Sequence, residues 1–157
     1  MTYARRSAVA CCLMALVVML SGPVSGASAS KASIKAALKS YDGKIAVAEG
    51  HTLSAIGEYK TTKNATPVEK AITASVTVLS ALRTKISHQS AGPARVKAAK
   101  SKLVKGLEAV IVSYGKLKTA FSLQSSNPEA AQAEVTKALA AVKSGRKKLN
   151  EAAKLLQ

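Results

Sequence analysis

The side chains able to do acid–base, redox or metal chemistry are few in this chain. It contains two histidines, eight carboxylates and two adjacent cysteines, Cys11 and Cys12. Enzymes and metal sites place such groups at set spacings, as in His-Glu-x-x-His or Cys-x-x-Cys-His, and neither motif occurs. A glycine-rich phosphate loop and a Gly-x-Ser-x-Gly nucleophile are missing as well. The residues therefore favour a protein that is not an enzyme and that holds no cofactor or metal.

The two histidines, His51 and His88, are predicted on successive antiparallel helices. Their levels along the helix axes differ by about 16 Å at the usual helical rise. They are then too far apart to bind one metal ion or one haem, and we expect both to be ordinary surface or hydrogen-bonded residues. Asp42 is the only aspartate, and most glutamates stand near lysines at helical spacing, which is typical of solvated ion pairs.

Charge is the strongest signal. The 157 residues include 24 Lys and Arg against 8 Asp and Glu, for a formal net charge of +16. Such an excess predicts an anionic partner. Lysine dominates over arginine, which disfavours bidentate base or phosphate recognition, and aromatic residues make up only 3% of the chain, so bases have few stacking platforms. We therefore expect non-specific attraction to lipid head groups, cell-wall polymer or extracellular nucleic acid.

The first 29 residues have the pattern of a secretory signal peptide. Arg5 and Arg6 form a basic start, residues 8–20 are apolar and uncharged, and Ala27-Ser28-Ala29 fits a cleavage site. The apolar stretch would span about 20 Å as a helix, which is short for a hydrocarbon core of about 30 Å, so a retained anchor is disfavoured. The cysteines lie near the start of that stretch, which disfavours lipid attachment.

Cleavage near Ala29 predicts a secreted, extracytoplasmic protein with one domain over residues 30–157. The mature chain then has no cysteine, methionine or tryptophan, and loss of Arg5 and Arg6 leaves a net charge of +14. A domain of this length can bury an adequate core without disulfides.

Apolar residues recur at intervals of three and four, which predicts helices over 31–61, 67–90, 94–124 and 128–156. Short joints between them predict antiparallel neighbours. We expect an all-α, up-down-up-down antiparallel four-helix bundle, or a three-helix bundle if the first helix breaks. The predicted core seams are Ile34, Leu38, Tyr41, Ile45, Ala48, Leu53 and Ile56; Val68, Ile72, Val76, Leu79, Leu82 and Ile86; Val96, Ala99, Leu103, Leu107, Val110, Tyr114, Leu117 and Phe121; and Val135, Leu139, Val142, Leu149, Ala153 and Leu156.

Local signals mark the helix ends. Thr66 and Glu69 flank Pro67 as a capping box, and Asn127 is placed to cap the last helix. Within the first helix, glycines recur every seven residues. They predict either a small-residue stripe that lets a neighbour approach or a frayed or kinked helix. These glycines are Gly43, Gly50 and Gly57.

Alternating helix directions would sort the charges. The end that holds the start of the first helix gathers sixteen basic and three acidic residues, whereas the other end has six and five. Antiparallel pairing of the last two helices about residue 126 places Lys105 level with Lys147. The predicted polyanion-binding residues are Lys97, Lys100, Lys102, Lys105, Lys143, Arg146, Lys147 and Lys148.

The leading hypothesis is an exported, non-enzymatic helical protein whose basic end binds an anionic surface or polymer non-specifically. One alternative is a protein-interaction module, such as an inhibitor or accessory subunit, that uses a helix face. Its candidate face is Val104, Val110, Ile111 and Val112, although we favour the interpretation that these residues simply widen the core. A further alternative is a carrier of an apolar ligand. Both the oligomeric state and the partner are left open by the sequence.

Overall fold

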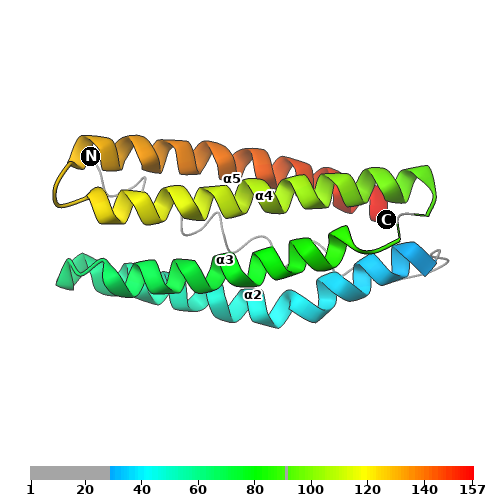
Figure 1. Ribbon diagram of the computed structural model, residues 1–157, viewed down its shortest axis with the longest axis horizontal. Coiled ribbons are helices and arrows are strands. Elements are labelled where there is room, and N and C mark those ends of the chain that lie inside the picture. The colour runs from blue at the N-terminus through cyan, green and yellow to red at the C-terminus, as the bar shows by residue number, and fades with distance from the viewer. Residues whose placement is uncertain (1–28, 91) are drawn as a thin grey trace.

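The computed structural model describes residues 29–90 and 92–157 as four α-helices with short connections and no strand among them (Figure 1). This confirms the all-α class, and each helix end lies within three residues of its predicted position. The predicted signal peptide, with its arginines and cysteines, falls on residues that lie outside the described ones, Ala29 excepted. The helices are α2 (Ala29–Thr62), α3 (Thr66–Ser87), α4 (Ala94–Leu123) and α5 (Pro128–Leu156).

The two predicted caps differ in outcome. Asn127 caps α5, because its side-chain oxygen accepts a hydrogen bond from the amide of Ala130 at 3.0 Å. The capping box at Thr66 is wrong: Thr66 is already helical and no side chain caps α3. Instead, the side-chain oxygen of Asn64 accepts from the Thr66 amide at 3.1 Å, so the residue two positions earlier satisfies that donor.

α2 is one continuous helix across its three glycines, although it changes direction part-way along in Figure 1. Gly43, Gly50 and Gly57 are exposed, and a Cβ atom added to any of them would meet nothing within 4 Å. The interpretation of these glycines as a stripe for close helix approach is therefore wrong. The three-helix alternative is also not observed, since the first helix does not break.

Consecutive helices pack against each other, and α4 with α5 makes the most extensive contact. α2 packs mainly on α3 and touches α4 only slightly. In Figure 1 the pair of α4 and α5 lies alongside the pair of α2 and α3. The buried apolar side chains of all four helices form one core cluster, as expected for amphipathic helices that bury their apolar faces.

Hydrogen bonds link segments that are far apart in the sequence at one end of the molecule. The Lys31 ammonium donates to the carbonyl of Gln157 at 3.0 Å, and Arg95 donates to the carbonyl of Lys154 at 3.2 Å. Lys85 reaches the hydroxyl of Ser40 at 3.1 Å. These contacts bring together the first half of α2, the end of α3, the start of α4 and the end of α5.

α4 and α5 meet along two heptad series of small buried residues. A Cβ atom on Gly145 would lie 3.0 Å from the carbonyl oxygen of Gly106, and one on Gly106 would lie 2.7 Å from Cγ of Leu149. The backbones therefore approach more closely at this crossing than side chains would allow. The two series are Ala99, Gly106, Ser113 and Ala120 on α4, and Ala131, Ala138, Gly145 and Ala152 on α5.

The buried seam of α2 departs from prediction over its second half, where Ala55 and Tyr59 are buried and Ile56 is only partly buried, and α3 departs from prediction at the adjoining level. Thr52 and Ser75 are buried there, whereas Leu53 and Val76 are only partly buried. Their hydroxyl oxygens lie 3.0 Å apart in a hydrogen bond, and the Ser75 hydroxyl also reaches the carbonyl of Ala48 at 3.1 Å. Because each hydroxyl satisfies the other, two polar residues occupy seam positions that we predicted to be apolar.

Candidate anion-binding site

α4 and α5 carry all eight predicted site residues, and ion pairs fix how the two helices align. Lys102 pairs with Glu151, and Lys116 pairs with Glu134 at 3.3 Å. These residue numbers add to 253 and 250, close to the 252 expected for pairing about residue 126. Lys105 and Lys147 therefore belong to the same level of the helix pair.

Two of the eight predicted residues are already engaged. Lys102 is bound to Glu151, and Lys100 donates to the carbonyl of Gln89 at 2.6 Å. The side chains of the other six make no hydrogen bond or ion pair with any residue that the structure describes. Lys97, Lys105, Lys143 and Lys147 are also exposed, so their ammonium groups are free to meet an outside anion.

The eight residues point to different sides of the α4–α5 pair. Lys105 follows Lys102 by three residues and Lys148 precedes Glu151 by three, so these residues share the side of the Lys102–Glu151 pair. Arg146 is half-buried, one turn from the buried Val142 and Leu149. Lys97, Lys143 and Lys147 stand two residues from the small-residue series, about 200° round their helices at 3.6 residues per turn.

Glu151 collects positive charge from both helices. The hydrogen bond from Lys102 holds the pKa of the Glu151 carboxyl below its ordinary value, and the charges of Lys102, Lys147 and Lys154 act in the same direction. Lys154 thus belongs to this cluster, although it was not among the eight predicted residues. Its position one turn after Glu151 is the sequence signal that could have found it.

The first half of α2 adds a second row of lysines to the same end. Lys31, Lys35 and Lys39 stand four residues apart, which puts them on one face of the helix. Tyr41 is the lone aromatic of this end among the described residues, and its ring centroid lies 5.1 Å from the Lys44 ammonium and 5.6 Å from the Lys85 ammonium. The tyrosine ring therefore already faces cations and is a poor platform for stacking bases.

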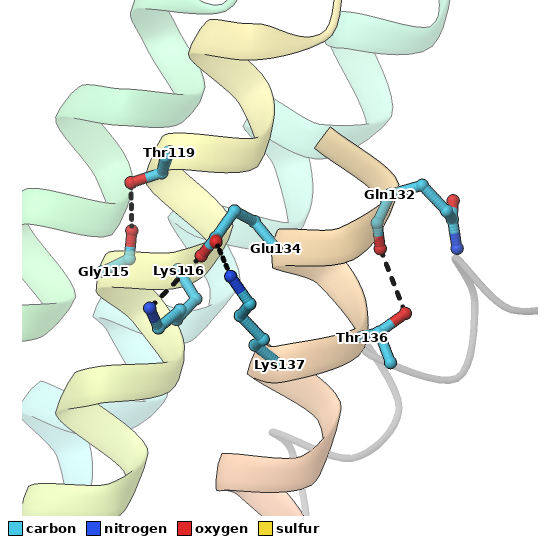
Figure 2. A network of polar contacts seen from close by, with 7 residues as sticks. All are labelled: Gly115, Lys116, Thr119, Gln132, Glu134, Thr136 and Lys137. Atoms are coloured by element: carbon cyan, nitrogen blue, oxygen red, sulfur yellow. Dashed lines mark hydrogen bonds and ion pairs between the residues drawn. The ribbon is translucent and has the colours of Figure 1, made fainter. Parts of the chain in front are cut away.

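The opposite end neutralises its charges locally. Figure 2 shows the carboxylate of Glu134 accepting from both Lys116, at 3.3 Å, and Lys137, at 2.6 Å. The Lys137 hydrogen bond is the main reason that the pKa of Glu134 lies below its ordinary value. One acid thus serves two bases, so a single net positive charge remains in this group.

The alternative helix face of α4 is mostly core. Val110 is buried, and Val104 and Ile111 are partly buried against the core cluster. Val112 is the one member of that set that is fully exposed, with 52% of its surface accessible. Three of these residues thus widen the core, and Val112 lies outside it.

His51 and His88 are both exposed, on α2 and at the end of α3. Among the described residues, no three His, Cys, Asp or Glu side chains gather as a possible metal site. None of the described helices is both long and apolar enough to span a membrane.

Neither a protein-family model, a curated protein nor a solved structure matches this chain. The candidate anion-binding site is therefore inferred from the positions and charges of this chain's residues, without support from a related protein.

Proposed function

We propose that this chain is an exported, non-enzymatic protein that docks through its basic end on an anionic surface or polymer. In this proposal the signal peptide is removed near Ala29, and residues 30–157 act as an up-down-up-down helical bundle. The cross-end hydrogen bonds of Lys31, Lys85 and Arg95 support that topology.

The observation that carries the proposal is the number of uncompensated bases on α4 and α5. The side chains of six of the eight predicted residues lack a hydrogen bond or ion pair within the described part of the chain, whereas at the other end Glu134 pairs with two lysines. Like charges held together repel one another, and this repulsion destabilises the folded state. A bound polyanion would relieve it and would release its own counterions.

Lysine ammonium groups favour a non-specific mode of binding. An ammonium acts as a point charge on a flexible stem and does not impose the fixed geometry of a guanidinium fork. The mature region has three arginines, and two of them are engaged: Arg83 with Glu108 at 3.3 Å, and Arg95 with the carbonyl of Lys154. We therefore expect affinity to follow charge density and salt rather than a particular sequence or head group.

Charge removal at matched positions tests the proposal. One variant changes the exposed lysines of α4 and α5 to glutamine: Lys97, Lys105, Lys143 and Lys147. Its control changes four exposed lysines of the other end: Lys60, Lys63, Lys70 and Lys118. Both variants have the same net charge, so any difference between them reports position.

Binding to phosphatidylglycerol vesicles and to a single-stranded oligonucleotide is measured over a salt series. We expect the basic-end variant to lose at least about tenfold in affinity, with a shallower salt dependence, because four phosphate contacts are lost. The control should lose much less. Equal losses in both variants would contradict a localised site, and unchanged binding in both would contradict charge-driven docking altogether.

The protein-interaction alternative has one exposed apolar residue in its favour, Val112. A partner held by such a contact would stay bound at high salt, whereas charge-driven binding weakens as salt screens the lysines. The alternative would be favoured by a partner that stays bound to the unaltered protein at high salt and no longer binds the Val112→Ser variant.

A further inference from the structure

A layer of polar side chains crosses the middle of the core. It consists of Glu49 and Thr52 from α2, Ser75 from α3 and Tyr114 from α4. Glu49 is 6% exposed, and the other three are at most 2% exposed. We call these four residues the buried polar layer. It is independent of the basic end and of any polyanion bound there.

Half of the buried polar layer is satisfied and half is not. The Thr52 and Ser75 hydroxyls lie 3.0 Å apart, and each lies within 3.1 Å of the Ala48 carbonyl oxygen, so their two protons can make two of these three hydrogen bonds at a time. The fully buried Tyr114 hydroxyl has no hydrogen-bond partner among the described residues. No described donor binds the Glu49 carboxyl group, whose oxygens keep a small contact with solvent within a residue that is 6% exposed. Burial without a partner disfavours a charged carboxylate far more than a neutral acid.

No cation from a neighbouring helix faces Glu49 in the described part of the chain. The group of α4 that lies near enough to be affected by the charge of Glu49 is the neutral Tyr114 phenol, and α3 contributes the uncharged Ser75 hydroxyl to the same layer. On α2 itself, His51 is exposed. Burial raises the pKa of Glu49 to about 7. Burial, and secondarily the charge of Glu49, raises the pKa of Tyr114, so the phenol stays protonated.

α2 is the helix best placed to respond to a charge at Glu49. It rests mainly on α3 and touches α4 only slightly. Its three glycines contact nothing on the outer face, and each weakens the helix by roughly 1 kcal/mol relative to alanine. A carboxylate that needs water can therefore obtain it by local loosening of α2, at lower cost than by opening the glycine crossing of α4 and α5.

We propose that Glu49 is a proton-operated latch on α2. When protonated, Glu49 stays in the buried polar layer and α2 remains docked on α3 and α4. When ionised, Glu49 moves toward water and α2 loosens, while α4 and α5 stay paired.

The direction with pH follows from the proton count. The folded protein holds the Glu49 proton more tightly than the unfolded chain does, where the pKa has its ordinary value of 4.5. The contribution of neutral Glu49 to stability is complete below pH 4.5, is lost as pH rises toward 7, and stays lost above it.

Nuclear magnetic resonance tests the latch in the intact protein, in Glu49→Gln and in Glu58→Gln, a control at an exposed glutamate on the same helix. The first readout is the carboxyl titration of Glu49, which should have its midpoint near 7. The second is the amide-exchange protection of α2, corrected for intrinsic exchange. Between pH 5.5 and 8, protection around residues 45–56 should fall roughly tenfold, within the limit of about thirtyfold that pKa values of 7 and 4.5 set over this pH range.

α4 and α5 should keep their protection over that range. Glu49→Gln should keep α2 protected at both pH values, whereas Glu58→Gln should behave like the unaltered protein. The latch is overturned if Glu49 titrates near 4.5, or if α2 loses protection equally in Glu49→Gln. The carboxyl titration stands by itself should Glu49→Gln fail to fold.

Discussion

Small residues recur every seven positions both in the pair of α4 and α5 and, within the pair of α2 and α3, along α2. The two series have opposite effects on helix packing. On α4, Gly106 stands in a heptad series that faces α5, and the two backbones nearly touch there. On α2, Gly50 stands in an equally regular series that faces solvent. A heptad of small residues thus brings helices together only where large apolar residues flank it on the same face, as Leu103 and Val110 flank Gly106.

The second difference between the pairs is the polarity of their contact. α2 and α3 are joined through the Thr52–Ser75 hydrogen bond, with Glu49 buried beside it. Ser113, the buried serine of the α4–α5 series, bonds only within its own helix, to the carbonyl of Val110. We infer that α4 and α5 form the stiffer platform, and that this platform carries the candidate anion-binding site.

The largest predicted effect is at the glycine crossing. Gly145→Val should lower the free energy of unfolding by about 3 kcal/mol, because its Cβ alone would lie 3.0 Å from a backbone oxygen and from Val110. Gly50→Val, on open helix surface, should be neutral or slightly stabilising. Urea unfolding measures both. Similar losses in the two variants would show that the pairs do not differ in closeness of packing.

A smaller effect is expected where a hydrogen bond crosses between helices. Ser75→Ala should cost about 1.5 kcal/mol, since it removes the links from α3 to Thr52 and to Ala48. The matched change Ser113→Ala should stay within about 0.5 kcal/mol, because only an intrahelical bond is lost and alanine suits both the helix and the close contact. If Ser113→Ala lowered the free energy of unfolding as much as Ser75→Ala, the hydrogen bonds between α2 and α3 would contribute no more to stability than a bond within α4.

The smallest predicted effect is a difference in stability between substitutions at the start of α5 and at the start of α3. Asn127→Ala should cost about 1 kcal/mol because it removes the cap of α5. Thr66→Ala at the start of α3 should change stability little, since the Thr66 side chain makes no capping bond. Thermal unfolding of the two variants checks this. If Thr66→Ala lost as much stability as Asn127→Ala, the result would support the predicted capping box at Thr66, which the structure does not show.

The sequence predicted the helices well because large apolar residues at steps of three and four leave few alternatives. In α4, seven of the eight predicted seam residues are buried, and Phe121 is partly buried. The register of α4 with α5 also followed from sequence, since a short turn near residue 126 fixes the pairing of antiparallel helices. The level shared by Lys105 and Lys147 could therefore be predicted.

The misplaced residues have a common physical reason. Leu53 and Val76 looked like better core residues than Thr52 and Ser75, because the hydroxyls satisfy each other only once the helices are docked. Glu49 follows the buried Ala48, but a lone carboxylate gives no sequence signal that it will be desolvated. The α4–α5 series escaped notice because alanine is abundant along the chain, whereas the glycines of α2 stood out.

The contact between Gly106 and Gly145 also has an electrostatic consequence. Ordinary helix pairs keep their axes 8–10 Å apart, and a backbone contact at glycine implies a separation at or below that range. The Debye length at physiological ionic strength is about 8 Å, so the ion atmospheres of α4 and α5 overlap. The charges of the two helices would then act on an anionic polymer as one field, and a bulky residue at Gly145 would move the two sets of lysines apart without removing a lysine.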